Sequence, residues 1–316
     1  MNKGHAVNNQ LARRNKVKRL LRNVWKYRVI YLMISVGVLY FIIFKYATFY
    51  GLLLAFKNYK IRLGIMGSPW VGLKNFSTVF SGKDFPRVFQ NTIIISFFKL
   101  LFGFPAPIII SLLLNELTAR RFKRVAQTAL YFPHFISWTI LAGMFYSLFS
   151  ATMGVIPRLL ASYGISMPSM IYDPNYIRGF LYATDVWKNV GWYTIIYLAA
   201  ISGIDPQLYD AAIVDGCNRF QQVRYVTLPS IMLTIVTLLV LNVGGIMNAG
   251  FEQIFNLESE ITRDVVDIID TYVYRFGLRS GKFEYATVVG ITKSIINCAL
   301  LFTANWVAGK LAESPF

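Results

Sequence analysis

Residues Tyr209-Asp-Ala-Ala-Ile-Val-Asp-Gly-Cys-Asn-Arg-Phe-Gln-Gln-Val-Arg-Tyr-Val-Thr-Leu-Pro229 form a polar stretch between two strongly apolar runs. A first short helix is expected to begin at Pro206, because proline suits the first helical turn and Asp205 can cap the exposed amides. Asp215-Gly216 is a turn signal that ends this helix. The stretch therefore predicts a helix, a bend and a second helix outside the apolar parts of the chain.

The second helix is expected over Asn218–Thr227, just before Pro229 starts the next apolar run. It carries Phe220, Val223 and Tyr225 among polar residues. A free loop rarely displays such an apolar set, so this surface is predicted to pack against a partner.

The composition around this stretch is that of a membrane protein. The chain has 316 residues, of which 55% are hydrophobic and only 15% are charged, against roughly 25% charged residues in soluble domains. Long apolar runs are each about as long as a helix that crosses a bilayer. They lie near Val29–Phe56, Thr92–Leu114, Ala126–Phe149, Phe180–Ile201, Ile231–Met247 and Tyr285–Val307.

These runs are continuous rather than alternating, and an open sheet cannot satisfy its edge groups in lipid. We therefore expect an all-α, polytopic membrane protein with six transmembrane helices. The fifth is the least apolar, because Asn242, Gly244, Gly245 and Asn248 dilute it.

Charge placement predicts the orientation in the membrane. Residues 1–28 carry nine Lys/Arg and no acidic residue directly before the first apolar run, which predicts a cytoplasmic N-terminus. With six spans the C-terminus is then also cytoplasmic (N-in/C-in). Residues 1–28 are predicted to form a basic amphipathic helix on the membrane lipid rather than a nucleic-acid-binding arm, since Val17, Leu20 and Val24 recur at helical spacing. Residues 29–316 form the transmembrane domain.

Cys217 and Cys298 are far apart and lack metal-ligand spacing, so neither a disulfide framework nor a zinc site is expected.

The polar stretch resembles the "EAA" loop of type I ABC importer permeases, whose pattern is E-A-A-x-x-D-G-A followed by L-P. The matching positions here are Asp210, Ala211, Ala212, Asp215, Gly216, Leu228 and Pro229. Asp210 stands where the family usually has Glu, and Cys217 where it has Ala. The resemblance implies that the coupling loop, residues 205–229 with Phe220, contacts a separate ATPase.

Further segments resemble sugar-importer permeases: Tyr40–Tyr46, Trp70–Phe76, Pro133–Trp138 and Asp270–Arg275. The most similar group (LplB-like, including alginate and pectin-fragment permeases) handles complex or acidic oligosaccharides. The resemblance implies the type I ABC importer fold and a multi-pass place in the bacterial cytoplasmic (inner) membrane. It also implies a heterodimer with a second homologous permease, two ABC ATPase subunits, and an extracellular solute-binding protein that delivers an oligosaccharide.

The chain is not expected to be an enzyme. Gly277-Leu-Arg-Ser-Gly-Lys282 comes nearest to a phosphate-binding loop but is one residue short and is followed by Phe283. ATP and Mg are therefore expected in the partner ATPase, with no cofactor or metal in this chain.

Sugars present apolar C–H faces and hydroxyls, so their sites combine aromatic side chains with amides or carboxylates. The first candidate substrate path is Asn242, Asn248, Phe251, Glu252 and Gln253, and the second is Trp187, Asn189, Trp192 and Tyr193. The alternatives are that the amides and glycines mediate helix packing, and that the aromatics anchor the helix at the membrane interface.

Charged residues inside predicted spans are functional hypotheses by default. Asp185 and Lys188 stand at i, i+3 and are expected to pair with each other, while Lys99 and Lys293 have no obvious partner. His134, beside Pro133, is expected to be a packed residue.

The acid-rich external segment, residues 252–284, repeats Val265, Ile268, Ile269, Tyr272 and Phe276 at helical spacing. We expect a helix over the cavity mouth that contacts the binding protein or packs on neighbouring spans.

The favoured function is oligosaccharide import, with acidic or complex glycans among the candidates. Import of another solute, such as an amino acid or phosphate, and ion-driven secondary transport are the alternatives.

Overall fold

The computed structural model describes residues 25–151 and 154–313, with side chains through residue 310, and within these ranges it is helical apart from one isolated bridge between Lys57 and Trp70. The predicted amphipathic helix of residues 1–28 lies almost wholly outside the described residues. The helices are α2 (Arg28–Phe41), η1 (Ile42–Tyr46), η2 (Ala47–Phe56), η3 (Ile61–Leu63), α3 (Gly64–Gly67), α4 (Lys74–Phe80), α5 (Asp84–Gly103), α6 (Pro105–Glu116), α7 (Arg120–Tyr131), η4 (Phe132–Phe135), α8 (Trp138–Phe149), α9 (Val155–Ser162), α10 (Ile177–Ser202), α11 (Pro206–Val214), α12 (Arg219–Gln222), η5 (Val223–Thr227), α13 (Leu228–Ser230), α14 (Met232–Gly244), α15 (Phe251–Leu257), α16 (Arg263–Val266), α17 (Ile269–Tyr272), η6 (Val273–Arg279) and α18 (Phe283–Glu313).

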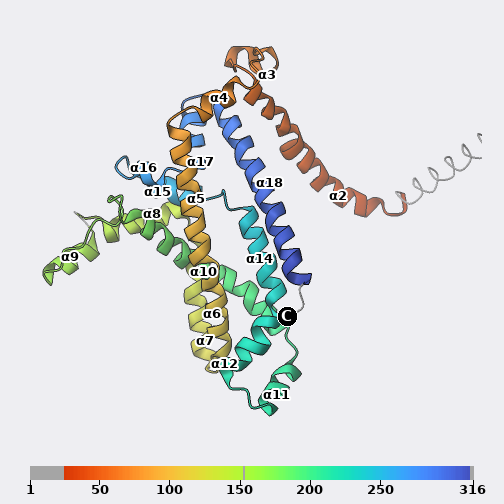
Figure 1. Ribbon diagram of the computed structural model, residues 1–316, viewed down its shortest axis with the longest axis vertical. Coiled ribbons are helices and arrows are strands. Elements are labelled where there is room, and N and C mark those ends of the chain that lie inside the picture. Colours follow the sequence, from red (N-terminus) through yellow and green to blue (C-terminus); the bar gives the residue numbers. More distant parts are fainter. Residues whose placement is uncertain (1–24, 152–153, 314–316) are drawn as a thin grey trace, which may run out of the picture.

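Each of the six predicted apolar runs lies mainly in helix, and successive long segments run in alternating directions (Figure 1). Three segments are long and apolar enough to cross a membrane: Arg28–Phe56, Asp84–Glu116 and Phe283–Lys310. Two bent pairs would raise the number to five, with bends of 104° between α7–η4 and α8 and 61° between α12–α13 and α14. α10 has the length, at 26 residues, but not the composition. Six crossings and the N-in/C-in orientation stay predictions.

Local sequence explains the main breaks. Proline at position 105 cannot donate to the preceding turn, so α5 ends at Gly103 and α6 restarts with Pro105. Pro133 marks η4 at the sharp bend, and Ser137 then caps α8 by accepting from the Ile140 amide at 3.4 Å.

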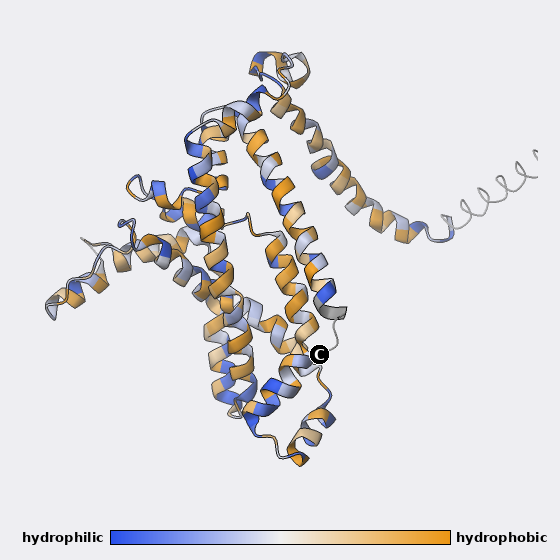
Figure 2. Ribbon diagram, in the orientation of Figure 1, coloured by the Kyte–Doolittle hydropathy of each residue, from blue (hydrophilic) through white to orange (hydrophobic). Residues whose placement is uncertain are grey.

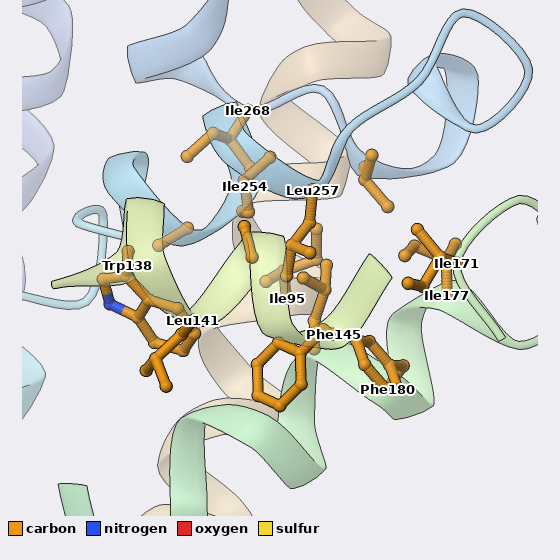
Figure 3. Packing of buried hydrophobic residues seen from close by; sticks show 14 residues of the cluster. Ile95, Trp138, Leu141, Phe145, Ile171, Ile177, Phe180, Ile254, Leu257 and Ile268 are labelled. Atoms are coloured by element: carbon orange, nitrogen blue, oxygen red, sulfur yellow. The ribbon is translucent and has the colours of Figure 1, made fainter. Parts of the chain in front are cut away.

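Three clusters of buried side chains hold the bundle together. Figure 3 shows the largest, where α8 packs against α5, α10 and α15 through Leu141, Phe145, Phe180 and Ile254. A second joins α4, α5, α17 and α18, and a third joins α6, α10 and α14. Since lipid is as apolar as these side chains, close packing rather than escape from water favours the contacts inside a bilayer.

α2 stands apart from the bundle (Figure 1). Neither α2 nor η1 contains a buried residue, although Figure 2 shows apolar residues along the whole helix. This surface needs lipid or another chain to cover it.

The prediction of one helix within residues 252–284 is wrong. The structure forms the short helices α15, α16 and α17, followed by the π-helical η6. Asp267 and Ile268 adopt extended backbone between α16 and α17, so Val265 and Ile268 do not share a helix despite their spacing.

Candidate functional site

The predicted coupling loop, residues 205–229, folds from local signals. Asp205 Oδ1 accepts from the Gln207 amide at 3.0 Å, and Pro206 occupies the first turn of α11. Both features are the ones that the sequence predicts, because the side-chain oxygen replaces a partner that the first helical amides lack.

A left-handed glycine ends α11. Gly216 has φ +78°, its amide donates to Ile213 O at 3.0 Å, and the Cys217 amide donates to Ala212 O at 2.9 Å. This pair of bonds is the Schellman motif, which satisfies the last carbonyls of a helix and favours glycine at the left-handed position. The bend between the two helices is therefore set by Gly216.

The second helix starts with a reciprocal cap. Asn218 Oδ1 accepts from the Gln221 amide at 2.9 Å, and Gln221 Oε1 accepts from the Asn218 amide at 2.8 Å. α12 then runs through η5 into α13 without a break in helical backbone. α13 ends at Ser230, and α14 begins at Met232 after a bend of 61° at Ile231.

One side-chain contact closes the loop on itself, and a second joins it to the bundle. The Tyr209 hydroxyl lies 2.9 Å from Thr227 Oγ1, and Arg219 Nη1 lies 3.0 Å from Glu116 Oε2 at the end of α6. The ion pair is exposed, so its contribution to stability is about 0–1 kcal/mol. It nevertheless places α12 next to α6.

The loop presents an apolar surface at the end of the molecule opposite α3 (Figure 1). Val214 is 87% exposed and Phe220 73% exposed, and Leu208, Ile213 and Tyr225 are exposed as well. Of the predicted coupling residues, Ala212 is buried and Leu228 half-buried, whereas the exposed ones are Asp210, Ala211, Asp215, Gly216, Phe220 and Pro229. The loop thus combines a rigid backbone with a contact surface that nothing in the described chain covers.

A cavity of about 230 Å³ lies between α5, α6, α10, α14 and the link that follows α14. Four predicted path residues line it: Asn189, Tyr193, Asn242 and Asn248. The structure therefore brings together members of both sequence candidates. The remaining lining residues are Ser96, Lys99, Leu100, Gly103, Phe104, Pro107, Asp185, Val186, Val190, Tyr197, Leu238, Gly245, Ile246, Ala249 and Gly250.

Lys99 joins three elements at this cavity. Its ammonium donates to Ala249 O at 2.8 Å and to Gln253 Oε1, and it lies 3.5 Å from Asp185 Oδ1. Gln253 in turn donates to Leu181 O at 2.8 Å and to Thr184 Oγ1 at 2.9 Å. The long-range contacts of Lys99 had no signal in the sequence.

The link before α15 depends on Gly250. Its φ is +95°, and a Cβ there would come within 2.7 Å of Lys99 Nζ. Glycine therefore serves both the left-handed backbone and the close approach of the ammonium.

The other predicted path residues lie outside the cavity lining. Gln253 is buried, and its side-chain oxygen accepts a hydrogen bond from Lys99, which lines the cavity. Phe251 stacks on Phe255 with ring centroids 5.2 Å apart, and Glu252 is exposed. Trp187 is 44% exposed and packs edge-on against Phe145.

The predicted Asp185–Lys188 pair does not form. Lys188 is buried and donates to the carbonyls of His134 at 2.7 Å and Ile136 at 2.6 Å, and more weakly to Pro133 at 3.3 Å. These carbonyls lie at the bend between α7 and α8, where the Pro133 carbonyl also accepts from the Ile136 amide at 3.2 Å. Asp185 pairs with Lys99 instead.

His134 is packed, as expected. Its ring stacks on Trp192 at a centroid distance of 4.7 Å and lies 3.2 Å from Asn189 Oδ1 through Nδ1. Lys293, which also lacked a partner in the sequence, pairs with Asp270 at 2.5 Å.

Buried charges organise the segment between α15 and α17. Asp267 is fully buried, pairs with Arg275 and accepts from Thr271 Oγ1 at 2.7 Å. Glu258 lies 3.6 Å from Arg275 Nη1. Burial raises the pKa of Glu258, Asp267 raises it further, and Arg275 and Arg263 offset part of the rise.

Residues 103–312 match the family model described as "Binding-protein-dependent transport system inner membrane component". The chain belongs to this family. It is similar to Protein LplB of Bacillus subtilis (strain 168), with 42% identity over 294 residues that cover 93% of this chain and 91% of the relative. It is also 40% identical over 308 residues to the polygalacturonan/rhamnogalacturonan transport system permease protein YteP of the same strain, covering 98% and 96% of the two chains.

Solved structures agree with this assignment. A chain of a bacterial ABC transporter involved in import of the acidic polysaccharide alginate superposes with a TM-score of 0.87 at 35% identity, covering 93% of this chain and 100% of that chain. A second structure, in complex with an alginate pentasaccharide-bound periplasmic protein, gives 0.86 at 34% identity, covering 94% and 100%. The expected type I ABC importer permease fold is confirmed. The chain is a transport subunit rather than an enzyme, and ATP is hydrolysed in a separate ATPase subunit.

Proposed function

We propose that this chain is a permease subunit of an ATP-driven importer of oligosaccharides in the bacterial inner membrane. The polygalacturonan/rhamnogalacturonan permease at 40% identity and the alginate importer at 35% identity support a glycan substrate, and complex or acidic glycans are the first to test. The chain works with a second homologous permease, two ATPase subunits that bind ATP and Mg, and an external solute-binding protein.

The observation that carries the coupling role is the exposed apolar surface of a loop whose backbone is rigidly capped. Phe220 is 73% exposed on α12, and α12 continues through η5 and α13 toward α14, which lines the cavity. A partner that grips Phe220 and moves would tilt α14 with it. Differential contact of this kind between two states is what shifts a conformational equilibrium.

The substrate path that we propose uses the cavity groups Asn189, Tyr193, Asn242 and Asn248. Amides and phenols both donate and accept hydrogen bonds, as sugar hydroxyls do. Four further path candidates do not line the cavity, and would reach the substrate only after the segments that carry them move during transport: Phe251, Glu252, Gln253 and Trp187.

The coupling role is tested by Phe220→Ala and Asp215→Lys in the assembled complex. Both are expected to lower glycan uptake at least about tenfold while the complex still hydrolyses ATP, because the ATPase loses its grip on the loop. Leu233→Ala is the matched control, since Leu233 is 78% exposed on α14 rather than on the loop. Uptake that survives both loop variants, or uptake in the absence of any ATPase, would contradict this function and favour ion-driven transport.

A further inference from the structure

The cavity contains one charge of each sign. Among the lining residues, all of which the structure describes, Lys99 and Asp185 are the charged ones, and they lie 3.5 Å apart. The charge of the cavity is thus balanced before any ligand enters.

The cation of this pair is held by several protein groups. A lysine ammonium has three donors. Lys99 donates to Ala249 O and Gln253 Oε1 and forms an ion pair with Asp185 Oδ1 at 3.5 Å. Its side chain is only 10% exposed. A ligand carboxylate would have to compete with two hydrogen bonds and an ion pair for this ammonium.

The anion keeps a free oxygen. Asp185 is 22% exposed, and its Oδ1 meets both Lys99 and the Asn189 amide, the latter at 3.3 Å. Oδ2 has no hydrogen-bond partner within residues 25–151 and 154–310. An ionised carboxylate oxygen accepts strongly from hydroxyl donors and repels another carboxylate.

The surroundings of Asp185 are polar but uncharged. Asn242 uses its amide nitrogen on Leu238 O at 2.7 Å, which leaves its carbonyl oxygen as an acceptor. Asn248 and Tyr193 add further neutral groups to the lining. At about 230 Å³, the cavity is below the roughly 300–1,000 Å³ of typical ligand pockets and suits a small part of a longer ligand.

We propose that Asp185 makes this cavity a subsite for an uncharged, hydroxyl-bearing sugar unit and selects against a unit that carries a carboxylate. The proposal rests on the oligosaccharide function proposed above. It assigns Asp185 as the specificity-determining acceptor and Lys99 as the residue that positions it. Carboxylates of an acidic glycan would have to lie elsewhere along the path.

A charge series tests the proposal. The complete complex in lipid nanodiscs is titrated with galactotriose and with trigalacturonate, which differ in the carboxylates at C6, and equilibrium binding is measured without the binding protein. The wild type is expected to bind the neutral trisaccharide at least about tenfold more tightly, because repulsion between nearby charges is strong where water is largely excluded.

The variants move the cavity charge in both directions. Asp185→Asn leaves Lys99 uncompensated, so the preference for the neutral sugar should fall by about tenfold or reverse. Lys99→Met should increase it, and the double variant should bring it back toward the wild-type value. Lys83→Gln is the control for a change of one charge, because Lys83 is exposed at the start of the same helix α5 and outside the cavity.

The two proposals fail in different ways. Equal or tighter binding of trigalacturonate by the wild type, or a preference that does not change in Asp185→Asn, would overturn the role of Asp185 and leave oligosaccharide import standing. Failure of both probes to bind, together with no stimulation of ATP hydrolysis by any glycan-loaded binding protein, would overturn the oligosaccharide function and this inference with it. Asp185→Asn keeps the size of the side chain, so its result does not depend on whether Lys99→Met folds.

Discussion

At the scale of single residues, Lys188 shows how an isolated charge can stabilise a broken helix. Its ammonium is the observed partner of the His134 and Ile136 carbonyls at the bend between α7 and α8. A buried carbonyl without a partner costs about 1–3 kcal/mol. Lys188→Met should therefore lower the free energy of unfolding by about 2 kcal/mol or more, measured by thermal melting of the assembled complex.

Lys188→Gln provides the matched comparison, because one amide can serve one of the two carbonyls and should recover part of the loss. If the Met and Gln variants melt at the wild-type temperature, the ammonium does not stabilise the bend. The ring of Trp138, 5.6 Å from Lys188 Nζ, would then be the better explanation for the position of the side chain.

Glu258 gives a prediction on pH. Its pKa is raised, first by burial and then by Asp267, so the folded protein favours the protonated carboxyl more than the unfolded chain does. The contribution of Glu258 to stability is therefore present below the unfolded value of 4.5 and is lost as the pH rises through the folded pKa. Glu258→Gln should be more stable than wild type at pH 7, and the difference should shrink toward pH 4.5.

Melting curves at both pH values check this prediction. A Gln variant that is less stable at pH 7 would mean that the contact with Arg275 outweighs burial. Glu260→Gln is the control, since Glu260 is exposed on the same segment.

At the scale of elements, the geometry of the coupling loop depends on one backbone conformation. Gly216 has φ +78°, whereas Gly203 at the end of α10 has φ −88°. Gly216→Ala should destabilise the bend between α11 and α12 by about 1 kcal/mol and weaken the coupling of ATP hydrolysis to uptake. Gly203→Ala should leave coupling unchanged, because a Cβ there meets only ordinary contacts at 3.5 Å and beyond.

Both variants are compared by the ratio of glycan taken up to ATP hydrolysed. Equal ratios for Gly216→Ala and wild type would show that the loop tolerates a different bend, and that its rigidity is not what transmits movement.

The same loop shows what sequence can predict. The Asp205 cap, the Pro206 start and the Gly216 bend are interactions within five residues, so residue type and order predict them. The partners of Lys99 and Lys293 are not local: Asp185 lies 86 positions after Lys99, and only the packed bundle brings the two together. The spacing of Asp185 and Lys188 permits an ion pair. The prediction that they pair is wrong because the bend beside Pro133 offers Lys188 better acceptors.

The prediction of one helix in residues 252–284 is wrong for a related reason. Its apolar residues recur at helical spacing, yet buried Asp267 must meet Arg275 and Thr271, and the extended backbone at Ile268 allows this. A fixed period predicts a helix only when no buried polar group competes for the backbone geometry.

At the scale of the whole molecule, the number of crossings depends on the bend of 104° between α7–η4 and α8. Either this pair is one broken span, or it enters the membrane and returns to the same side. The six-span prediction takes the first reading, and the alternating course of the long segments in Figure 1 agrees with it. In the first reading three spans separate η3 from α11, so the two elements lie on opposite sides of the membrane. In the second reading two spans separate them, so they lie on the same side.

Whether η3 and α11 lie on the same side of the membrane can be measured at two exposed positions. Ile61 in η3 is 73% exposed and Val214 at the end of α11 is 87% exposed. α3, which directly follows η3, and α11 lie at opposite ends of the molecule (Figure 1). After Cys217 and Cys298 are replaced by serine, Ile61→Cys should react with a membrane-impermeant maleimide in intact cells. Val214→Cys should react only after permeabilisation, because three crossings put it on the cytoplasmic side. Labelling of both positions in intact cells would mean that the α7–α8 pair does not cross, and it would leave the coupling loop on the side where no ATPase can reach it.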